Sequence, residues 1–188
     1  MATTFKVIFL GNIGVDIDQT EGNRIVEDAA SLLSGTSYGA SGDPLYGHIQ
    51  EFTPGVAGYL GGLDGHYDTN NDLSLDDFRL DGGDLQVVDS TVSGQATLTY
   101  ADGTTATLSN AVFFQDTDGN LYLAPQLGQN SDQIAMEAKA ILSIKIDSII
   151  GTTGELVASR AVGNYAEPDG IVTGTSGDDI MPIGYVDA

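Results

Sequence analysis

The densest set of oxygen-bearing side chains in this sequence falls on alternate residues between positions 68 and 76. Calcium prefers several carboxylate, amide and hydroxyl oxygens supplied by one curved loop, so this segment is a candidate cation site. The predicted ligands are Asp68, Asn70, Asp72, Ser74 and Asp76. The match to the helix–loop–helix calcium template is partial, because Leu73 stands where the turn glycine belongs and Arg79 where the bidentate glutamate belongs. A solvated polar loop held by Asx turns explains the same residues and is the stronger interpretation.

Two further acidic clusters have structural explanations. Residues 116–120 also alternate oxygen-bearing side chains, but the Asp118-Gly119 pair is typical of a tight hairpin turn. Asp16, Asp18 and Glu21 precede a predicted helix, where the helix dipole and unpaired amides stabilise carboxylates. We therefore assign neither cluster to a metal.

Residues suited to catalysis are scarce. His48 and His66 are the only histidines, and neither belongs to a closely spaced metal-binding pair or lies near a recognisable nucleophile turn. The absence of cysteine excludes disulfides, thiolate metal sites and cysteine nucleophiles. The sequence predicts no catalytic residue and no enzyme, with both histidines in turns or at the surface. A carboxylate pair for glycoside cleavage stays open, because the fold assembles such pairs and 27 acidic residues supply candidates.

Tyrosines punctuate the glycine-rich stretch from residue 35 to residue 67. Long glycine-rich connections in a compact domain are usually functional loops or long crossings at a sheet edge. Tyr38, Tyr46, Tyr59 and Tyr67 could form a platform on which sugar rings stack, although loop tyrosines more often pin backbone to the core. A carbohydrate-binding or glycan-cleaving module that uses the loops from residue 36 to residue 77 is therefore an alternative function.

The charge balance narrows the choice of partners. Six Lys and Arg residues against 27 Asp and Glu give a formal net charge of −21. Binding to nucleic acid depends on basic side chains that neutralise phosphates, so nucleic acid is not an expected partner, and neither is an anionic membrane surface. No segment approaches the roughly 18 to 20 apolar residues that a membrane crossing needs, so no membrane insertion is expected. So one-sided a charge repels itself, and calcium or other multivalent cations are the expected compensation.

The elements that must position these residues are mostly strands. Apolar and alternating patterns predict strands at residues 5–10, 48–52, 85–88, 95–100, 105–108, 111–115, 121–123, 141–150 and 156–162. Apolar residues three and four apart predict a helix over 23–34, between Asn23 as N-cap and Gly35, and a shorter helix is predicted over 131–140. Asp-Gly pairs at 102–103 and 118–119 predict hairpin turns. The predicted fold is mainly β, an antiparallel β-sandwich or jelly-roll-like architecture with one or two short helices, and barrel closure is an alternative.

The end of the chain differs in composition from the rest. Residues 169–184 combine closely spaced glycines with the Asp178-Asp179 pair. This segment resembles the opening of the glycine- and aspartate-rich calcium-binding arrays called RTX repeats, which implies that Asp178 and Asp179 are calcium ligands in an intact array. One repeat cannot complete a cation cage, because ligands come from neighbouring turns. We therefore expect a β-sandwich domain over residues 1–168 and the start of a repeat region over 169–188 of a longer polypeptide.

Three segments carry a wider resemblance. Thr4–Gly11, Asp16–Asn23 with the Glu-Asp-Ala-Ala helix after it, and the Val112–Pro125 hairpin resemble the N-terminal domain of bacterial proteins with RTX-like repeats and a hedgehog/intein (Hint) self-processing domain. The resemblance implies export in one step by a C-terminal signal, without an N-terminal signal peptide, into calcium-rich extracellular or cell-surface surroundings. The Hint residues themselves are absent, so the resemblance assigns no autocleavage to this chain.

These observations favour a non-catalytic structural or adhesive module of a secreted or cell-surface calcium-binding protein. We expect it to self-associate into a homo-oligomer, filament or surface assembly. The alternatives are the carbohydrate-directed module described above and a surface protein of a phage-like particle.

Overall fold

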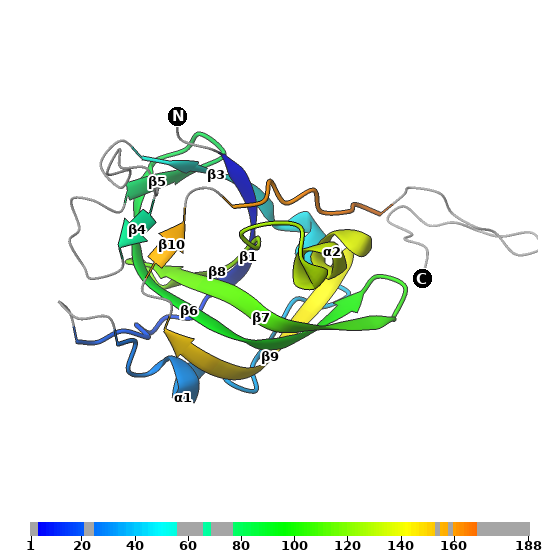
Figure 1. Cartoon of the computed structure of the whole chain (residues 1–188), viewed down its shortest axis with the longest axis horizontal. Helices are drawn as coiled ribbons and strands as arrows, with labels where there is room; N and C mark the ends of the chain where they lie inside the picture. Colours follow the sequence, from blue (N-terminus) through cyan, green and yellow to red (C-terminus); the bar gives the residue numbers. More distant parts are fainter. Residues whose placement is uncertain are drawn as a thin grey trace, which may run out of the picture.

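The computed structural model describes residues 4–20, 25–55, 66–68, 77–152, 155–157 and 160–168, with backbone alone for residues 66–68, 152 and 155–157 (Figure 1). The helices in these ranges are α1 (Ala29–Leu33), the 3-10 turn η1 (Leu45–Gly47) and α2 (Ser131–Ala138). The strands are β1 (Phe5–Asn12), β2 (Ser37–Tyr38), β3 (Ile49–Pro54), β4 (His66–Asp68), β5 (Asp77–Leu80), β6 (Leu85–Tyr100), β7 (Thr105–Asp116), β8 (Asn120–Ala124), β9 (Ile141–Thr152) and β10 (Glu155–Val157). The prediction of a mainly β, antiparallel fold with two short helices is confirmed.

Strand pairing closes part of the main sheet on itself. Its strand order is β2-β9-β6-β5-β3-β1-β8-β7, and β6 also pairs with β7. Six strands, from β6 through β5, β3, β1 and β8 to β7, therefore form a closed ring, while β9 and β2 extend the sheet from β6 (Figure 1). Strands β4 and β10 form a separate two-stranded sheet. Ring closure leaves the edge of the main sheet at β2 and β9.

Aromatic side chains fill the interior of this ring, which we call the inner core. Its buried aromatic residues come from five different strands and are Phe5, Phe52, Phe78, Phe114 and Tyr122. Phe52 stacks on both Phe5 and Phe78 with ring centroids 4.6 Å apart in each pair. Phe114 meets Phe52 and Phe78 edge-on, at 5.7 and 5.9 Å. Stacked and edge-to-face contacts of this kind stabilise a core beyond the burial of area alone.

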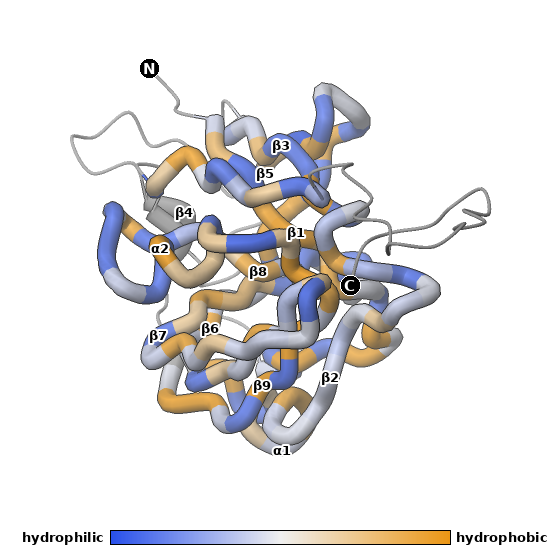
Figure 2. Tube along the Cα trace, turned by 90° about the vertical axis from the view of Figure 1, so that its right-hand side faces the viewer, coloured by the Kyte–Doolittle hydropathy of each residue, from blue (hydrophilic) through white to orange (hydrophobic). Residues whose placement is uncertain are grey.

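The opposite faces of the same strands are also buried, in what we call the outer core. Successive strand residues point to opposite faces, so Ile8 and Phe113 pack outside the ring while their neighbours pack inside it. Leu33 of α1, Met136 of α2 and residues of β9 cover this second face. The hydrophobic stretches of β1 and β8 accordingly lie near the centre of the molecule (Figure 2). Burial on both faces explains why residues 7–10 of β1 and 121–124 of β8 are unbroken apolar runs.

Two strands are longer than the sequence predicts. The predicted strands at 85–88 and 95–100 belong to the single strand β6, and those at 105–108 and 111–115 belong to β7. The β6–β7 pairing shifts register between Gly94 and Ala96, and the β6–β9 pairing shifts next to Gly94 as well. A Cβ added at Gly94 would lie 2.4 Å from the carbonyl oxygen of Ser148. Gly94, in the gap between the two predicted strands, therefore marks a bulge with a close backbone approach.

The N-terminal helix is shorter than predicted. The pattern indicated a helix from Asn23 to Ser34, but residues 25–28 are not helical, residues 21–24 lie outside the described ranges, and α1 covers Ala29–Leu33. The backbone N–H of Asp28 donates to the carbonyl of Ile17 at 3.0 Å, so the preceding loop takes up a group that a longer helix would have used. The predicted helix at 131–140 is observed as α2, and Asn130 caps it by accepting from the Gln133 N–H at 2.9 Å.

Residues 160–168 form a segment that we call the C-terminal strap, drawn in orange in Figure 1. The N–H of Lys6 in β1 donates to the Val162 carbonyl at 2.8 Å, and the N–H of Asn164 donates to Glu137 of α2 at 2.8 Å. Arg160 donates to the Pro125 carbonyl at 2.6 Å. The strand predicted at 156–162 is therefore wrong in its second half, because these residues belong to the docked strap, while β10 occupies Glu155–Val157.

Candidate functional site

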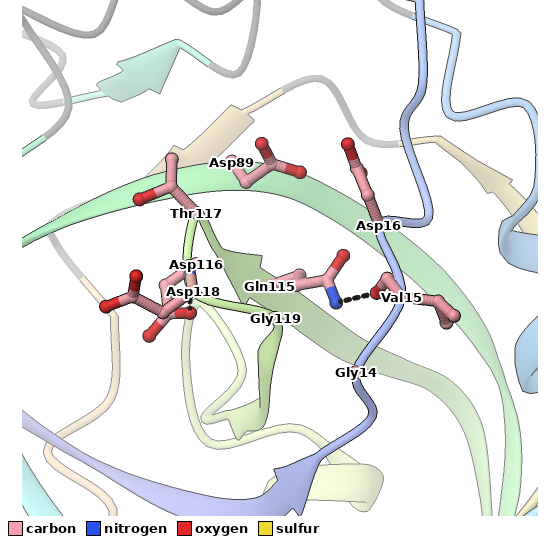
Figure 3. A pocket seen from close by; sticks show the side chains of 9 residues that line it. All are labelled: Gly14, Val15, Asp16, Asp89, Gln115, Asp116, Thr117, Asp118 and Gly119. Atoms are coloured by element: carbon pink, nitrogen blue, oxygen red, sulfur yellow. Dashed lines mark hydrogen bonds between the residues drawn. The ribbon is translucent and has the colours of Figure 1, made fainter.

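The loops that follow β1 and β7 meet at a pocket of about 240 Å³, which we call the acidic pocket (Figure 3). Gly14, Val15, Asp16, Asp89, Gln115, Asp116, Thr117, Asp118 and Gly119 line it. The sequence presented Asp16 and the 116–120 turn as unrelated clusters, and the fold brings them together with Asp89 of β6. The N–H of Ile13 joins the two loops by donating to the Gly119 carbonyl at 3.0 Å.

Gln115 holds the first of these loops in place. Its side chain is buried, with 1% of the residue exposed. Nε2 donates to the Val15 carbonyl at 2.7 Å, the bond drawn in Figure 3, and Oε1 accepts from the Ile17 N–H at 3.0 Å. Sequence reasoning missed Gln115 and Asp89, because a polar residue within a strand pattern reads as a solvent-facing position. The available sequence signal was their position, because Gln115 is the last residue of one predicted strand and Asp89 directly follows another.

Asp116 organises the second loop. Its Oδ1 accepts from the N–H groups of Asp118 at 3.0 Å and Asn120 at 2.8 Å, and its Oδ2 accepts from the Asn120 amide at 2.8 Å and the Tyr122 hydroxyl at 3.1 Å. Gly119 adopts a φ of 82°, as the predicted Asp-Gly turn requires. Burial raises the pKa of Tyr122 far above its usual value, and the Asp116 carboxylate adds to that shift. Four donors therefore occupy Asp116, and its role is that of a turn residue.

Asp16 has a local role of the same kind. Its Oδ1 accepts from the Asp18 N–H at 2.7 Å, which is an Asx turn. The prediction that the N-terminus of a helix stabilises the Asp16 and Asp18 carboxylates is wrong, because α1 begins at Ala29 and the residues just before it are not helical. Asp16 and Asp118 are exposed, so water screens their charge.

The described residues do not provide a calcium cage. Within the described ranges, no group of three or more His, Asp or Glu side chains is placed to hold a metal ion. The predicted ligands Asn70, Asp72, Ser74, Asp76, Asp178 and Asp179 lie outside those ranges. Asp68 is described as backbone only, at the end of β4, where its register partner in β10 is Glu155. The calcium-site predictions therefore stay predictions.

His48 ties η1 to its surroundings. Its Nδ1 lies 3.2 Å from the Phe9 carbonyl oxygen, and its Nε2 lies 2.7 Å from Asp43 Oδ1. Both ring nitrogens thus have partners within the fold. This agrees with the prediction of a turn residue, whereas His66 is described only as backbone in β4.

A second pocket, of about 290 Å³, contains one of the predicted sugar-stacking tyrosines. We call it the Tyr46 pocket, and its polar and aromatic lining comes from Lys6, Tyr46, Gln50, Glu51, Asp81 and Glu167. Tyr38 does not line it, because that ring packs against the outer core and its hydroxyl accepts from Thr36 Oγ1 at 3.3 Å. Tyr59 lies outside the described residues, and Tyr67 is described only as backbone in β4. Tyr46 is thus the predicted tyrosine that the described structure places at a pocket.

Comparison with known proteins gives no relative: no protein-family model matches the chain, and neither does any curated protein or solved structure. Among the helices in the described ranges, none has the length and apolar content that a membrane crossing requires.

Proposed function

We propose that this chain is a non-catalytic structural or adhesive module of a secreted or cell-surface calcium-binding protein of the RTX-like, Hint-containing type, and that it self-associates. The observation that carries this proposal is how the fold uses its polar side chains. Asp116, Gln115 and His48 have the residue types of a reaction centre, yet hydrogen bonds within the fold engage all three. Asp116 holds its own turn, Gln115 holds the loop after β1, and His48 bonds Phe9 and Asp43.

Groups with shifted pKa values support the same proposal. A general acid or base needs a perturbed group that reaches a substrate. Here burial is the main cause of the raised pKa values of Tyr122 and Tyr165, and burial lowers the pKa of Arg160 to about 10. All three residues lie in the protein interior, with Arg160 7% exposed. The burial that shifts these three pKa values also keeps the groups away from a substrate.

Net charge and strand register support calcium as a partner. A net charge of −21 repels itself in a compact domain, and bound cations would relieve that repulsion. The register of β4 and β10 puts Glu155 opposite Asp68, the first residue of the predicted calcium loop. A cation bound near this end of the strand pair would relieve part of that repulsion.

The open edge of the main sheet supports self-association. β2 pairs with β9 only at Ile144 and Lys145. Beyond Ile146, the described residues make one hydrogen bond to the backbone at this edge of β9. The Ile149 N–H donates it to Ser34 Oγ at 3.2 Å. Ile150 is 60% exposed on the same strand. An exposed strand edge with an apolar side chain is a template for pairing with another chain.

The test is thermal unfolding and light scattering of the purified chain with calcium or with EDTA. We expect calcium to raise the melting temperature and the molar mass, because a ligand at a hundredfold excess over its Kd stabilises the folded state by about 2.7 kcal/mol. The double variant Asp72→Asn, Asp76→Asn should lose this response. Asp118→Asn, an exposed aspartate outside the predicted loop, is the matched control and should keep it. Equal stability and a monomeric mass in both buffers, together with turnover of a substrate, would contradict the proposal.

A further inference from the structure

The Tyr46 pocket draws its walls from five parts of the chain. Lys6 comes from β1, Tyr46 from η1, Gln50 and Glu51 from β3, and Glu167 from the C-terminal strap. Asp81 follows β5 directly and completes the lining. The pocket therefore exists only where the ring and the strap are both in place.

The turn that carries Tyr46 is fixed by a buried leucine and by backbone hydrogen bonds. Leu45 is fully buried in the outer core, and the N–H of Gly47 donates to the Pro44 carbonyl at 3.0 Å. The N–H of His48 donates to the Leu45 carbonyl at 2.9 Å, and the His48 ring bonds β1 as described above. Tyr46 is half-buried at the pocket as a result. A turn whose backbone is fixed in this way presents its side chain without a large ordering cost for the backbone.

Two hydrogen bonds to the backbone of Glu51 fix Asp81. Its N–H donates to the Glu51 carbonyl at 2.9 Å, and its Oδ1 accepts from the Glu51 N–H at 2.8 Å. With a φ of 50°, Asp81 is the non-glycine residue of the described ranges that adopts a positive φ. A positive φ is uncommon outside glycine, although aspartate tolerates it better than most residues. The backbone geometry thus holds this carboxylate at the pocket wall.

The chemistry of the lining selects a class of ligand. Glu51, Asp81 and Glu167 supply carboxylate acceptors, whose charge disfavours an anion. Lys6 supplies an ammonium donor that forms no ion pair among the described residues, so the lining offers charged donors and acceptors together. Gln50 both donates and accepts. A ligand that matches donors, acceptors and an aromatic ring in one small space is neutral, carries several hydroxyl groups and has an apolar face.

We propose that the Tyr46 pocket binds a neutral sugar ring, with Tyr46 against its apolar face and the surrounding polar side chains on its hydroxyl groups. The volume of about 290 Å³ lies at the small end of ligand pockets, as one sugar ring requires. Because Glu167 belongs to the strap, an occupied pocket should also hold the strap more tightly against β1.

The experiment is an NMR titration of the full chain, labelled with nitrogen-15, by methyl glucoside, methyl galactoside and N-acetylglucosamine, each up to high millimolar concentration. We expect at least one sugar to shift the amides of Gly47, Gln50 and Glu51 and to slow hydrogen exchange in the strap. Lysine methyl ester serves as a cationic probe and sodium acetate as an anionic one. If no sugar shifts these amides, or if the cationic probe shifts them in place of the sugars, the proposal is wrong.

Variants separate recognition from folding. Tyr46→Ala should weaken sugar binding about tenfold through loss of the stacking ring, whereas Tyr46→Phe should keep it. Gln50→Ala is a second variant should Tyr46→Ala unfold, and Asp118→Asn, outside the pocket, should bind as the unmodified chain does. If Tyr46→Ala and Gln50→Ala both bind the sugar with the affinity of the unmodified chain, the assignment is wrong. The titration is run with EDTA and again with calcium, so its outcome stands apart from the calcium-dependent assembly tested above.

Discussion

The inner and outer cores are built on the same strands but are closed in different ways. The inner core is aromatic, and hydrogen-bonded strands surround it on every side of the ring. The outer core is mostly aliphatic and is covered by separate pieces, which are α1, α2, β9 and the strap. Ring closure fixes the spacing of the inner side chains, whereas each cover of the outer core depends on its own few tethers. The inner core should therefore respond to substitution as one unit, and the outer core piece by piece.

The largest expected effect is at the centre of the inner core. Phe52→Ala removes a ring that stacks on Phe5 and Phe78 and meets Phe114 edge-on, and the sealed ring has little room to collapse. We expect a loss of about 3–5 kcal/mol in the free energy of unfolding, measured by urea denaturation. In the outer core, Phe113→Ala removes a ring of the same size and should cost less, because separately tethered covers can settle into the space. Similar losses at the two positions would remove the distinction between the cores.

The next effect lies where β9 pairs with β6 of the ring. Gly94→Ala places a Cβ 2.4 Å from the Ser148 carbonyl oxygen, and this neighbour is backbone that cannot rotate away. We expect a loss of about 2–3 kcal/mol. Hydrogen exchange should speed up in β9 before it does in β8, because β9 pairs with β6 across this point and β8 does not.

Gly151→Ala is the matched control in the same sheet. Nothing lies within 4 Å of a Cβ at this position. Its stability should change by less than about 1 kcal/mol. Early exchange of β8 in Gly94→Ala would mean that the ring and its extension unfold together.

Gly94 also shows how much of the fold could be predicted from the sequence. The predictions at 5–10, 121–123 and 141–150 are confirmed as β1, β8 and β9, because apolar patterns record which faces are buried. Whether a glycine in a strand pattern is a turn or a bulge depends on the strand that lies beside it. The chain around Gly94 has no local signal for β9, which follows about fifty residues later, so one strand was read as two.

The pockets were harder to predict than the strands. The hairpin turn at Asp118 and Gly119 was predictable from that residue pair, whereas the hydrogen bonds of Asp116 became known only with the fold. The Tyr46 pocket joins Lys6, Asp81 and Glu167, and these residues meet only because β1 pairs with β3 and the strap docks along β1. Contacts of such long sequence separation leave no periodic pattern. The sequence therefore indicated Tyr46 as a candidate binding residue, but the other residues of its pocket could be identified only from the fold.

A smaller effect should follow from releasing the strap. Glu137 accepts from the Asn164 N–H at 2.8 Å and from the side chain of Gln133 at 2.7 Å. Glu137→Ala removes the acceptor that ties the strap to α2, at a cost of about 1–2 kcal/mol. Hydrogen exchange should increase at Asn164 and Tyr165, while the amides of β3 and β5 stay protected. Thermal unfolding alone would miss this local change, so exchange is the measurement that decides. Faster exchange across the inner core would contradict the piecewise behaviour of the outer one.

The smallest effect concerns the pH dependence of that tether. Burial raises the pKa of Glu137, but hydrogen bonds from Gln133, Asn164 and Gln129 outweigh burial and leave the pKa below its usual value. A carboxyl whose pKa is lower in the folded state stabilises that state fully above its unfolded pKa, and this contribution fades as the pH falls through the folded value. Glu137→Gln keeps the shape and removes the titration. The stability difference between the unmodified chain and Glu137→Gln, measured by urea unfolding, should therefore be present at neutral pH and shrink in acid. A difference that stays constant with pH would show that shape, and not charge, holds the strap to α2.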